Sequence, residues 1–146
     1  MFWAAMSKIE KSNLDGTQRD IIVSSSLVSA HSITVDRKRK RVFWVDYTKD
    51  QIESVNYSGS NRVLLSRIQG VTNLFGIAFT SSFLFVGEWH GNTVFKVNAS
   101  NGTVVGSVQF ASSAPSGSRG IYGYDSTLQP PGLQTNSTNL HQSCSQ

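Results

Sequence analysis

The sequence predicts an all-β fold, part of a β-propeller with four antiparallel strands in each blade. A short aromatic segment begins at Phe2, Phe43 and Phe85, at spacings of 41 and 42 residues. Turn residues separate the strand-like segments that follow each copy. A period of about 40–45 residues with four strands is typical of a propeller blade. Propellers close with about 4–8 blades, so a chain of 146 residues holds about three blades of a larger ring.

Equivalent residues recur in step with the aromatic segments, which indicates a repeat and not a chance similarity. Glycines recur at 43 residues, isoleucines at 44 and arginines at 43. The three sets are Gly16, Gly59 and Gly102; Ile33, Ile77 and Ile121; Arg19 and Arg62. We therefore place the repeats near residues 2–42, 43–84 and 85–125.

The four strands are clearest in the middle of the chain. Short β-branched and aromatic segments alternate there with turn residues at 37–40, 48–50 and 58–61. The predicted strands are Ser32–Asp36, Arg41–Tyr47, Gln51–Tyr57 and Arg62–Ser66. The segments around Phe2 and Phe85 give the same pattern.

These motifs resemble the YWTD repeats of the low-density lipoprotein receptor family. The tetrapeptide appears as Phe43-Trp44-Val45-Asp46, and the incoming strand appears as Phe75-Gly76-Ile77-Ala78. The companion pattern Ile-x-x-x-Asn-x-x-Gly-x-x-Arg runs from Ile9 to Arg19 and again from Ile52 to Arg62. The resemblance implies a six-bladed ring of which residues 1–128 form the C-terminal half. The resemblance also implies that the segment around Ile121 is the innermost strand of a further blade. It implies structural roles for Phe43, Trp44, Asp46, Gly76, Arg19 and Arg62.

The resemblance also implies an EGF-like module after the propeller. Residues 129–146 would be a linker and the degenerate start of that module, with Cys144 as its second cysteine. Leu140 stands where the first cysteine is expected, so the disulfide partner of Cys144 is missing. Neighbouring EGF-like modules and the missing blades of a parent chain are therefore expected partners.

The copies depart from the repeat at three positions. Ala5 replaces the motif aspartate in the first copy, which predicts weaker hydrogen bonding there, and Glu88 replaces it in the third. His31-Ser32 stands where Phe75-Gly76 stands in the next copy. Because glycine allows close approach of the backbone, its loss at Ser32 predicts a distorted strand.

The positive charge is confined to one segment. The formal net charge is +4, but five of the 13 basic residues lie together at 37–41, and the rest of the chain is nearly balanced. The segment between two predicted strands is interpreted as an exposed turn, with contact to a polyanion such as heparin as the alternative. We expect no nucleic-acid partner, since nuclear import conflicts with the extracellular features below.

Enzyme signatures are absent from the sequence. It contains no Gly-x-Ser-x-Gly, phosphate loop or His-Glu-x-x-His, and one terminal cysteine cannot organise zinc. His31, His90 and His141 have no carboxylate or serine partner at motif spacing. We predict no catalytic residue, no metal and no cofactor, with a propeller hydrolase as a distant alternative.

Side chains at strand ends are the candidate ligand-binding residues. In related propellers the loops that enter the first strand and leave the second form the protein-binding face. By that resemblance the face contains Tyr47, Phe75, Glu88, Trp89 and His90. Exposed aromatic residues are frequent interface anchors, although packing between blades is the alternative for each of them. The imidazole of His90 could release a ligand in an acidifying endosome, or it is a solvated turn residue.

Four N-glycosylation sequons indicate an extracellular chain, at Asn56, Asn98, Asn101 and Asn136. No segment has the length of a membrane span or the form of a signal peptide, so we expect a larger membrane-anchored receptor at the plasma membrane or endosome to contain this chain. Its function would be binding of extracellular protein ligands in endocytic uptake or pH-dependent release. A Wnt-type signalling co-receptor and a matrix or adhesion protein are the alternatives. Open blade edges predict poor stability in isolation.

Overall fold

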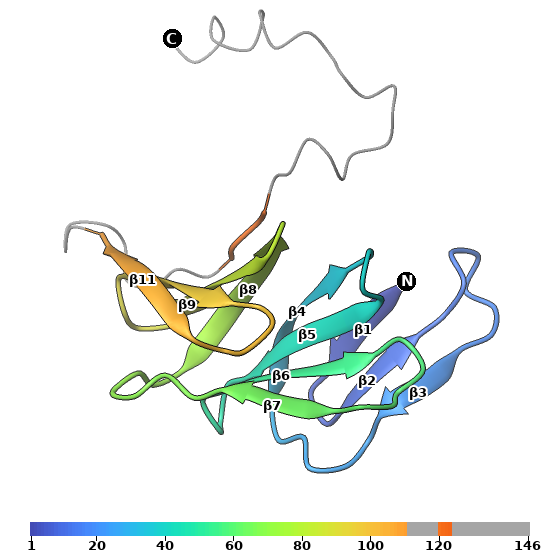
Figure 1. Cartoon of the computed structure of the whole chain (residues 1–146). Helices are drawn as coiled ribbons and strands as arrows, with labels where there is room; N and C mark the ends of the chain where they lie inside the picture. The colour runs from blue at the N-terminus through green and yellow to red at the C-terminus, as the bar shows by residue number, and fades with distance from the viewer. Residues whose placement is uncertain (111–119, 124–146) are drawn as a thin grey trace, which may run out of the picture.

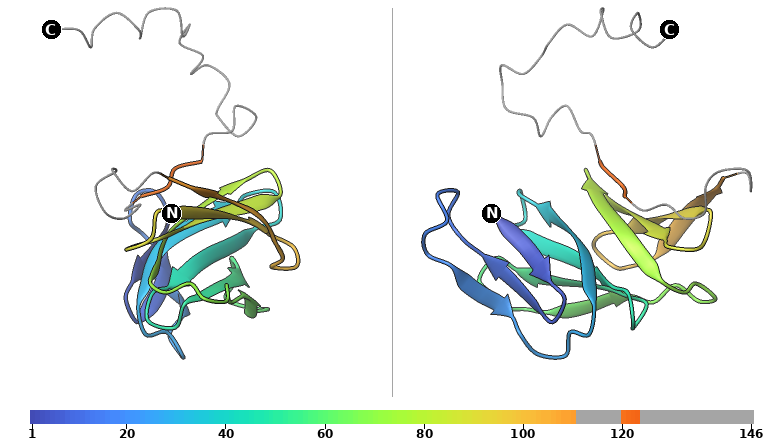
Figure 2. Two further views of the ribbon diagram at one scale, coloured as in Figure 1. Left: turned by 90° about the vertical axis from the view of Figure 1, so that its left-hand side faces the viewer. Right: turned by 180° about the vertical axis from the view of Figure 1, so that it is seen from behind.

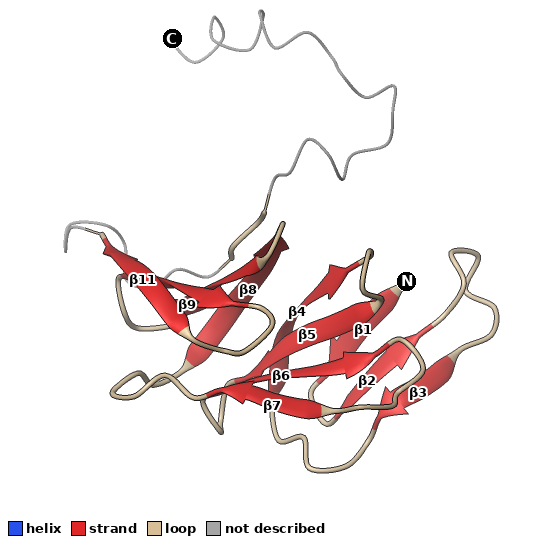
Figure 3. Cartoon of the chain, in the orientation of Figure 1, coloured by secondary structure: helices blue, strands red, loops and turns tan. Residues whose placement is uncertain are grey.

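The computed structural model describes residues 1–110 and 120–123, and these residues form eleven strands and no helix (Figure 3). The strands make three antiparallel sheets of three, four and four strands. This confirms the predicted all-β, partial propeller. None of the described residues forms a helix that could cross a membrane.

The three sheets follow one another along the chain (Figure 1). Sheet 1 contains β1 (Phe2–Ala5), β2 (Lys8–Lys11) and β3 (Asp20–Val23). Sheet 2 contains β4 (Ala30–Asp36), β5 (Arg41–Asp46), β6 (Gln51–Asn56) and β7 (Val63–Ser66). Sheet 3 contains β8 (Leu74–Thr80), β9 (Phe83–Glu88), β10 (Thr93–Asn98) and β11 (Val104–Gln109).

The strands of each sheet are paired in chain order, as in a propeller blade. The strands predicted around residues 32–66 match β4 to β7 within two residues at each end. The motif strand is second in sheets 2 and 3 but first in sheet 1, where β1 is the counterpart of β5 and β9. Sheet 1 therefore has no described strand in the innermost position.

The segment around Ile121 lies beside β8 but is not a strand. A Cβ atom on Gly76 would lie 3.3 Å from Cγ1 and 3.4 Å from the backbone nitrogen of Ile121. Residues 120–123 have no ladder partner in the described part of the chain, which is why they are not assigned as a strand. Gly76 thus allows the close approach that the sequence indicates.

The sheets stand side by side as blades of an open arc (Figure 2). One apolar cluster between sheets 1 and 2 is centred on Ile9, Val42 and Trp44. A second between sheets 2 and 3 contains Phe43, whose ring stacks on Phe79 at a centroid distance of 5.8 Å. Burial of these side chains between the sheets supplies the main driving force that holds the arc together.

The aromatic residues of the strands are buried where a neighbouring sheet covers them. Phe43 and Trp44 of sheet 2 have 1% and 0% of their surface exposed. Phe2, Trp3, Phe85 and Phe95 belong to the terminal sheets and are half-buried.

The expectation of a distorted strand at His31-Ser32 is wrong. β4 runs unbroken for seven residues, and its register shift between Ala30 and Ser32 matches that of β8 between Leu74 and Gly76. The Ser32 hydroxyl fits because it accepts a hydrogen bond from the backbone nitrogen of Ile77 at 3.2 Å. Thr34 does the same for Phe79 at 3.1 Å, so serine and threonine link the inner strands of adjacent blades.

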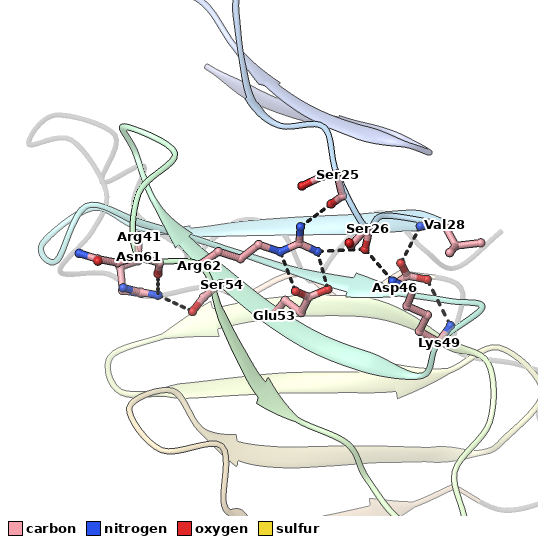
Figure 4. Close-up of polar contacts among 10 residues, drawn as sticks. All are labelled: Ser25, Ser26, Val28, Arg41, Asp46, Lys49, Glu53, Ser54, Asn61 and Arg62. Carbon is pink, nitrogen blue, oxygen red and sulfur yellow. Dashed lines mark hydrogen bonds and ion pairs between the residues drawn. The ribbon is translucent and has the colours of Figure 1, made fainter.

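A tryptophan, a glutamate and an arginine line up across sheet 2 and join it to sheet 1. Trp44 is directly opposite Glu53 in the β5–β6 ladder. Arg62 donates to Glu53 at 2.8 Å and lies over the Trp44 ring at 5.4 Å. The same guanidinium donates to the backbone oxygens of Ser25 and Ser26 in the loop that leaves sheet 1 (Figure 4). A buried ion pair therefore fixes the connection between the blades.

Asp46, the motif aspartate, holds the other end of this loop. Its carboxylate is buried and accepts a hydrogen bond from the backbone nitrogen of Val28 at 2.9 Å (Figure 4). It also accepts one from the backbone nitrogen of Ser29 at 3.3 Å. It also accepts from the backbone nitrogen of Lys49, whose ammonium donates to the Ser26 carbonyl. We call residues 24–29 the linking loop. Ala5 has no carboxylate to make such bonds in sheet 1, in line with the departure seen in the sequence.

The tryptophan, glutamate and arginine recur in sheet 1 and are replaced in sheet 3. Arg19 donates to Glu10 at 2.9 Å and lies over Trp3 at 5.3 Å, and this hydrogen bond holds the pKa of Glu10 below its ordinary value. The ladders place Phe95 opposite Val86 in sheet 3, where sheet 2 has Glu53 opposite Trp44. Sheet 3 thus packs apolar groups where the other two sheets pack an ion pair.

The three equivalent glycines provide a graded test of the packing. Gly16, Gly59 and Gly102 all have φ near +80°, but an added Cβ is free at Gly16, 2.8 Å from the Ile22 oxygen at Gly59, and in overlap with the Leu65 carbonyl at Gly102. We expect Gly16→Ala to lower the free energy of unfolding by about 1 kcal/mol and Gly102→Ala by about 3 kcal/mol. Urea denaturation measures both, with Gly59→Ala between them. Equal effects would contradict the close contact.

Breaking the Glu53–Arg62 pair should be costly because Glu53 has only 5% of its surface exposed. We expect Arg62→Met to lower the free energy of unfolding by about 3 kcal/mol or more, since a buried carboxylate loses its partner. The exposed Arg37→Met should change it by less than about 0.5 kcal/mol. The double variant Glu53→Leu with Arg62→Met should recover part of the loss in urea denaturation, and no recovery would contradict the buried-charge explanation.

Candidate protein-binding face

The start of each inner strand and the end of each motif strand meet at one edge of the arc. The antiparallel ladders pair Ala30 with Asp46 in sheet 2 and Leu74 with Glu88 in sheet 3. The residues next to these pairs therefore emerge together. The backbone bonds from Tyr47 to Ser29 and from Trp89 to Asn73 close both corners at 2.8 Å.

Aromatic rings from both sheets form one continuous cluster at this edge. Phe75 is central: its ring centroid lies 4.8 Å from His31, 6.4 Å from Tyr47 and 4.4 Å from Trp89. His31 also contacts Tyr47 at 5.1 Å, and Trp89 contacts His90 at 6.2 Å. The cluster joins two blades, because His31 and Tyr47 come from sheet 2 and the other three from sheet 3. We call these five residues the aromatic cluster.

The members of the aromatic cluster are all accessible to a partner. His31 and His90 are exposed, while Tyr47, Phe75 and Trp89 are half-buried by contact with one another. Partial burial of stacked rings fixes their orientation and leaves their outer surface available for binding. Such an arrangement suits recognition of another protein by rigid aromatic anchors.

Four of the five residues that the sequence indicated lie in this cluster, and the fifth, Glu88, borders it. The Glu88 carboxylate folds over Gly91, where an added Cβ would overlap it. Asp46 holds its own turn in the same way through Lys49. Glu88 therefore shapes the corner that carries Trp89 and His90.

Sequence reasoning did not include His31 among the site residues. Its signal was nevertheless present, since His31 occupies the repeat position of Phe75. The structure gives both residues the same place at the start of an inner strand. Repeat equivalence predicts this position, but only the fold shows that the imidazole contacts two rings.

A groove of about 400 Å³ continues from the aromatic cluster along the inner strands. It is lined by His31, Thr34 and Phe75 and by residues 120–123. Tyr122 has 96% of its surface exposed. The groove extends the candidate face toward the centre of the arc.

The basic segment lies at the opposite end of sheet 2, in the turn between β4 and β5. The predicted turn is confirmed, because β4 ends at Asp36 and β5 begins at Arg41. Asp36 accepts hydrogen bonds from the backbone and side chain of Arg39, and Arg41 donates to Asn56 and Ser54. Polyanion contact by the remaining basic side chains stays a prediction.

The described residues contain no cluster of three or more metal-ligating side chains. His31 and His90 contact aromatic rings.

Three of the four sequons lie in the described residues. Asn101 is exposed in the turn between β10 and β11, where it accepts a hydrogen bond from the backbone of Thr103. Asn56 and Asn98 are half-buried, and their side chains bond within their own turns. Asn136, Cys144 and the predicted linker and module at 129–146 lie outside the described residues.

Curated relatives match part of the chain. Low-density lipoprotein receptor-related protein 5 from Mus musculus and from Homo sapiens are both 39% identical over 59 residues, which is 40% of this chain and 4% of each relative. No protein-family model matches the chain. The chain thus spans a small fraction of the length of these relatives.

Solved structures extend the comparison to the whole fold. The nidogen propeller in the structure of the nidogen/laminin complex superimposes with a TM-score of 0.67 and 23% identity, covering 74% of this chain and 42% of that chain. The fold is that of a partial β-propeller, and 59 residues of the chain are similar to low-density lipoprotein receptor-related protein 5. Two more distant propellers share the fold alone.

These two are the Pan2 WD40 domain of Neurospora crassa and a luciferin-regenerating enzyme. The Pan2 domain gives a TM-score of 0.60 and 9% identity, covering 74% of this chain and 32% of that chain. The enzyme gives a TM-score of 0.55 and 14% identity, covering 70% of this chain and 36% of that chain. Fold similarity of this kind does not transfer chemistry, because a site depends on its own residues.

The contact between Phe75 and Trp89 should contribute measurably to the stability of the chain. We expect a double-mutant cycle of Phe75→Leu and Trp89→Leu to give a coupling energy of about 0.5–1.5 kcal/mol in urea denaturation. Phe110→Leu is the control partner for Phe75, because Phe110 is exposed at the end of β11 and should give a coupling near zero. Equal couplings for both pairs would contradict the cluster geometry.

Proposed function

We propose that this chain is the ligand-binding part of an extracellular receptor of the low-density lipoprotein receptor-related kind, and that the aromatic cluster binds a protein ligand. The continuous contact of His31, Tyr47, Phe75 and Trp89 across two blades supports the proposal most strongly. Rigid aromatic side chains bury a large area on binding at little cost in conformational entropy. The chain contributes recognition and no covalent chemistry.

The proteins that the chain resembles support an extracellular location. The receptor-related protein 5 sequences are similar over 59 residues, and the nidogen propeller was solved in complex with laminin. We infer that the chain lies on the extracellular side of a membrane-anchored parent, joined to EGF-like modules and to further blades. Among the sequons in the described residues, Asn101 is the exposed one and is therefore the best placed to carry a glycan.

Endocytic uptake with release at low pH is the first form of this function. Two imidazoles, His31 and His90, lie in the aromatic cluster, and imidazoles generally gain a proton between pH 5 and 8. A histidine in a binding face is a general means of making binding depend on pH. Glu88 and Lys49 are the charged residues of the neighbouring corners that would modulate this effect.

A matrix or adhesion role is the second form. The similarity to the nidogen propeller favours it, because that propeller was solved in complex with laminin. A Wnt-type co-receptor would use the same face for a signalling ligand. Endocytic uptake, a matrix role and a co-receptor role would differ in their ligand and in the pH dependence of binding. All three would use the aromatic cluster as the binding site.

A binding experiment tests the shared proposal. Peptides selected from a displayed random library on the wild-type chain are measured by surface plasmon resonance on wild type, Trp89→Ala and Phe110→Ala. We expect most selected peptides to bind Trp89→Ala about 30-fold more weakly, as for an aromatic hot spot, and Phe110→Ala unchanged. Undiminished binding to Trp89→Ala would overturn the assignment of the face.

The same peptides separate the forms of the function. Weaker binding at pH 5.5 than at pH 7.4, abolished in His31→Gln with His90→Gln, would support endocytic release. A pH-independent affinity would favour the co-receptor or matrix forms, and binding of purified laminin that requires Trp89 would select the matrix form.

A further inference from the structure

A polar pocket lies between sheets 2 and 3, at the end of the arc opposite to the aromatic cluster. Its volume is about 470 Å³, within the range of small-ligand sites, which is about 300–1,000 Å³. The turn between β4 and β5 forms one wall, and the turns of sheet 3 supply Ser82, Asn98 and Ser100 to the other. Because the pocket lies between two blades of this chain, further blades at either end of the arc would leave it in place.

Contacts within and between the two sheets fix the walls of the pocket. Gly102, in a turn of sheet 3, lies so close to β7 that an added Cβ would overlap the Leu65 carbonyl. The backbone nitrogen of Ala99 donates to the Ser82 carbonyl at 3.0 Å, which joins the two turns of sheet 3. Phe43 and Leu65 add apolar side chains to the lining. The pocket is therefore built into the junction between the blades.

Two arginines of the pocket are held in place by their neighbours. Arg39 donates from Nη1 to Asp36 at 3.0 Å. Arg41 donates from Nη1 to Asn56 at 3.0 Å and from Nη2 to Ser54 at 2.6 Å (Figure 4). The Nε atoms of both arginines have no hydrogen bond to a described residue. Fixed guanidinium groups with N–H donors to spare suit the paired oxygens of a sulfate or carboxylate group.

Positive charge exceeds negative charge at this pocket. Among the described residues that line it, Asp36 is the one acidic side chain, and its carboxylate is buried and paired with Arg39. The other four basic side chains of the segment form no ion pair with a described residue: Arg37, Lys38, Lys40 and Arg41. The first three of these are exposed. Their charges favour an anionic partner.

The pocket favours a sulfated sugar chain among the polyanions. Basic segments of this length are typical of nuclear localisation signals and of surfaces that bind nucleic acid or heparin. Binding of single-stranded nucleic acid also uses exposed aromatic rings for base stacking, and the one aromatic residue among the described residues of the lining, Phe43, is buried. Anionic lipids face the cytoplasm, whereas the proposed function places this chain outside the cell.

We propose that the turn between β4 and β5 and the adjoining pocket form a binding site for a sulfated glycosaminoglycan. Arg39 and Arg41 would hold a sulfate group at the pocket, while Lys38 and Lys40 would contact neighbouring sulfates along the sugar chain. The choice of a sulfated sugar rests on the extracellular location in the proposed function. The site is at the other end of the blades from the aromatic cluster, so a protein ligand and a sugar chain can bind together.

Surface plasmon resonance on an immobilised heparin oligosaccharide tests the charged turn. The 146-residue chain is prepared without N-glycans, because Asn98 lines the pocket. We expect Lys38→Gln with Lys40→Gln to bind heparin about tenfold more weakly than the wild type, since two exposed charges lose their sulfate contacts. A wild-type chain that does not bind heparin at physiological salt would overturn the proposal.

A charge-matched variant separates a local site from net charge. Lys8→Gln with Lys96→Gln removes the same charge from sheets 1 and 3, outside the pocket lining. We expect this variant to bind heparin within about twofold of the wild type. Equal losses in the two double variants would overturn the site and indicate a response to net charge alone.

A pocket-filling substitution tests the pocket without changing any charge. Ser82→Tyr keeps the backbone carbonyl that accepts from Ala99, and its ring should occupy the space of the sulfate group. We expect it to weaken heparin binding about fivefold. Ser107→Tyr is the control, because Ser107 is exposed on β11 outside the lining, and it should bind as the wild type does. Unchanged binding in Ser82→Tyr would overturn the role of the pocket.

Competing anions identify the class of partner. Soluble heparin should displace the chain from immobilised heparin, whereas polyglutamate and single-stranded DNA of equal charge should compete about tenfold less well. Equal competition by polyglutamate would overturn the proposal in favour of an acidic protein segment, and equal competition by DNA would overturn it in favour of nucleic acid.

Peptides selected on the wild-type chain distinguish this inference from the proposed function. Their binding should require Trp89 and should be the same with and without saturating heparin, because the two sites lie at opposite ends of the blades. Absent heparin binding together with intact, Trp89-dependent peptide binding would contradict the sugar site alone. Displacement of the peptides by heparin would contradict two separate sites.

Discussion

The structure depends on hydrogen bonds and apolar contacts that cross from one blade to the next. A single four-stranded sheet leaves both faces open, so its stability comes from its neighbours. The linking loop shows how the contact is made: Asp46 binds its backbone nitrogens, while Arg62 and Lys49 bind its carbonyls. Asp46 and Arg62 therefore each hold the preceding blade in place.

This constraint positions the candidate face. Once sheets 2 and 3 are fixed side by side, the beginnings of β4 and β8 lie at one edge, and His31 contacts Phe75 at 4.8 Å. Neither sheet alone contains the cluster, since Tyr47 and Trp89 come from different blades. Binding by this face therefore requires the arc to remain intact. Apolar packing supports both junctions, and the hydrogen bonds from Arg62 to the linking loop strengthen the one between sheets 1 and 2.

Most of the fold was predictable from the sequence, because equivalent residues of a repeat take equivalent positions in each sheet. Strands around Trp44 and the turn at residues 37–40 follow from equivalent positions, whereas the candidate face with Phe75 and Trp89 was suggested by the family resemblance. The regular strand at Ser32 could not be predicted, since its hydroxyl bonds to the backbone of another blade. The contacts of His31 and the exposed state of Arg19 likewise depend on the spatial arrangement of the blades, which a linear pattern does not contain.

Hydrogen exchange of the linking-loop amides tests the central claim most directly. The backbone nitrogens of Val28 and Ser29 donate to the buried Asp46 carboxylate of the next blade. Amide exchange followed by NMR should therefore be slow at both positions in the wild type and much faster in Asp46→Ala, while the exposed turn at Leu14 exchanges rapidly in both proteins. Val28 and Ser29 amides that exchange as fast as Leu14 in the wild type would contradict a coherent arc of blades.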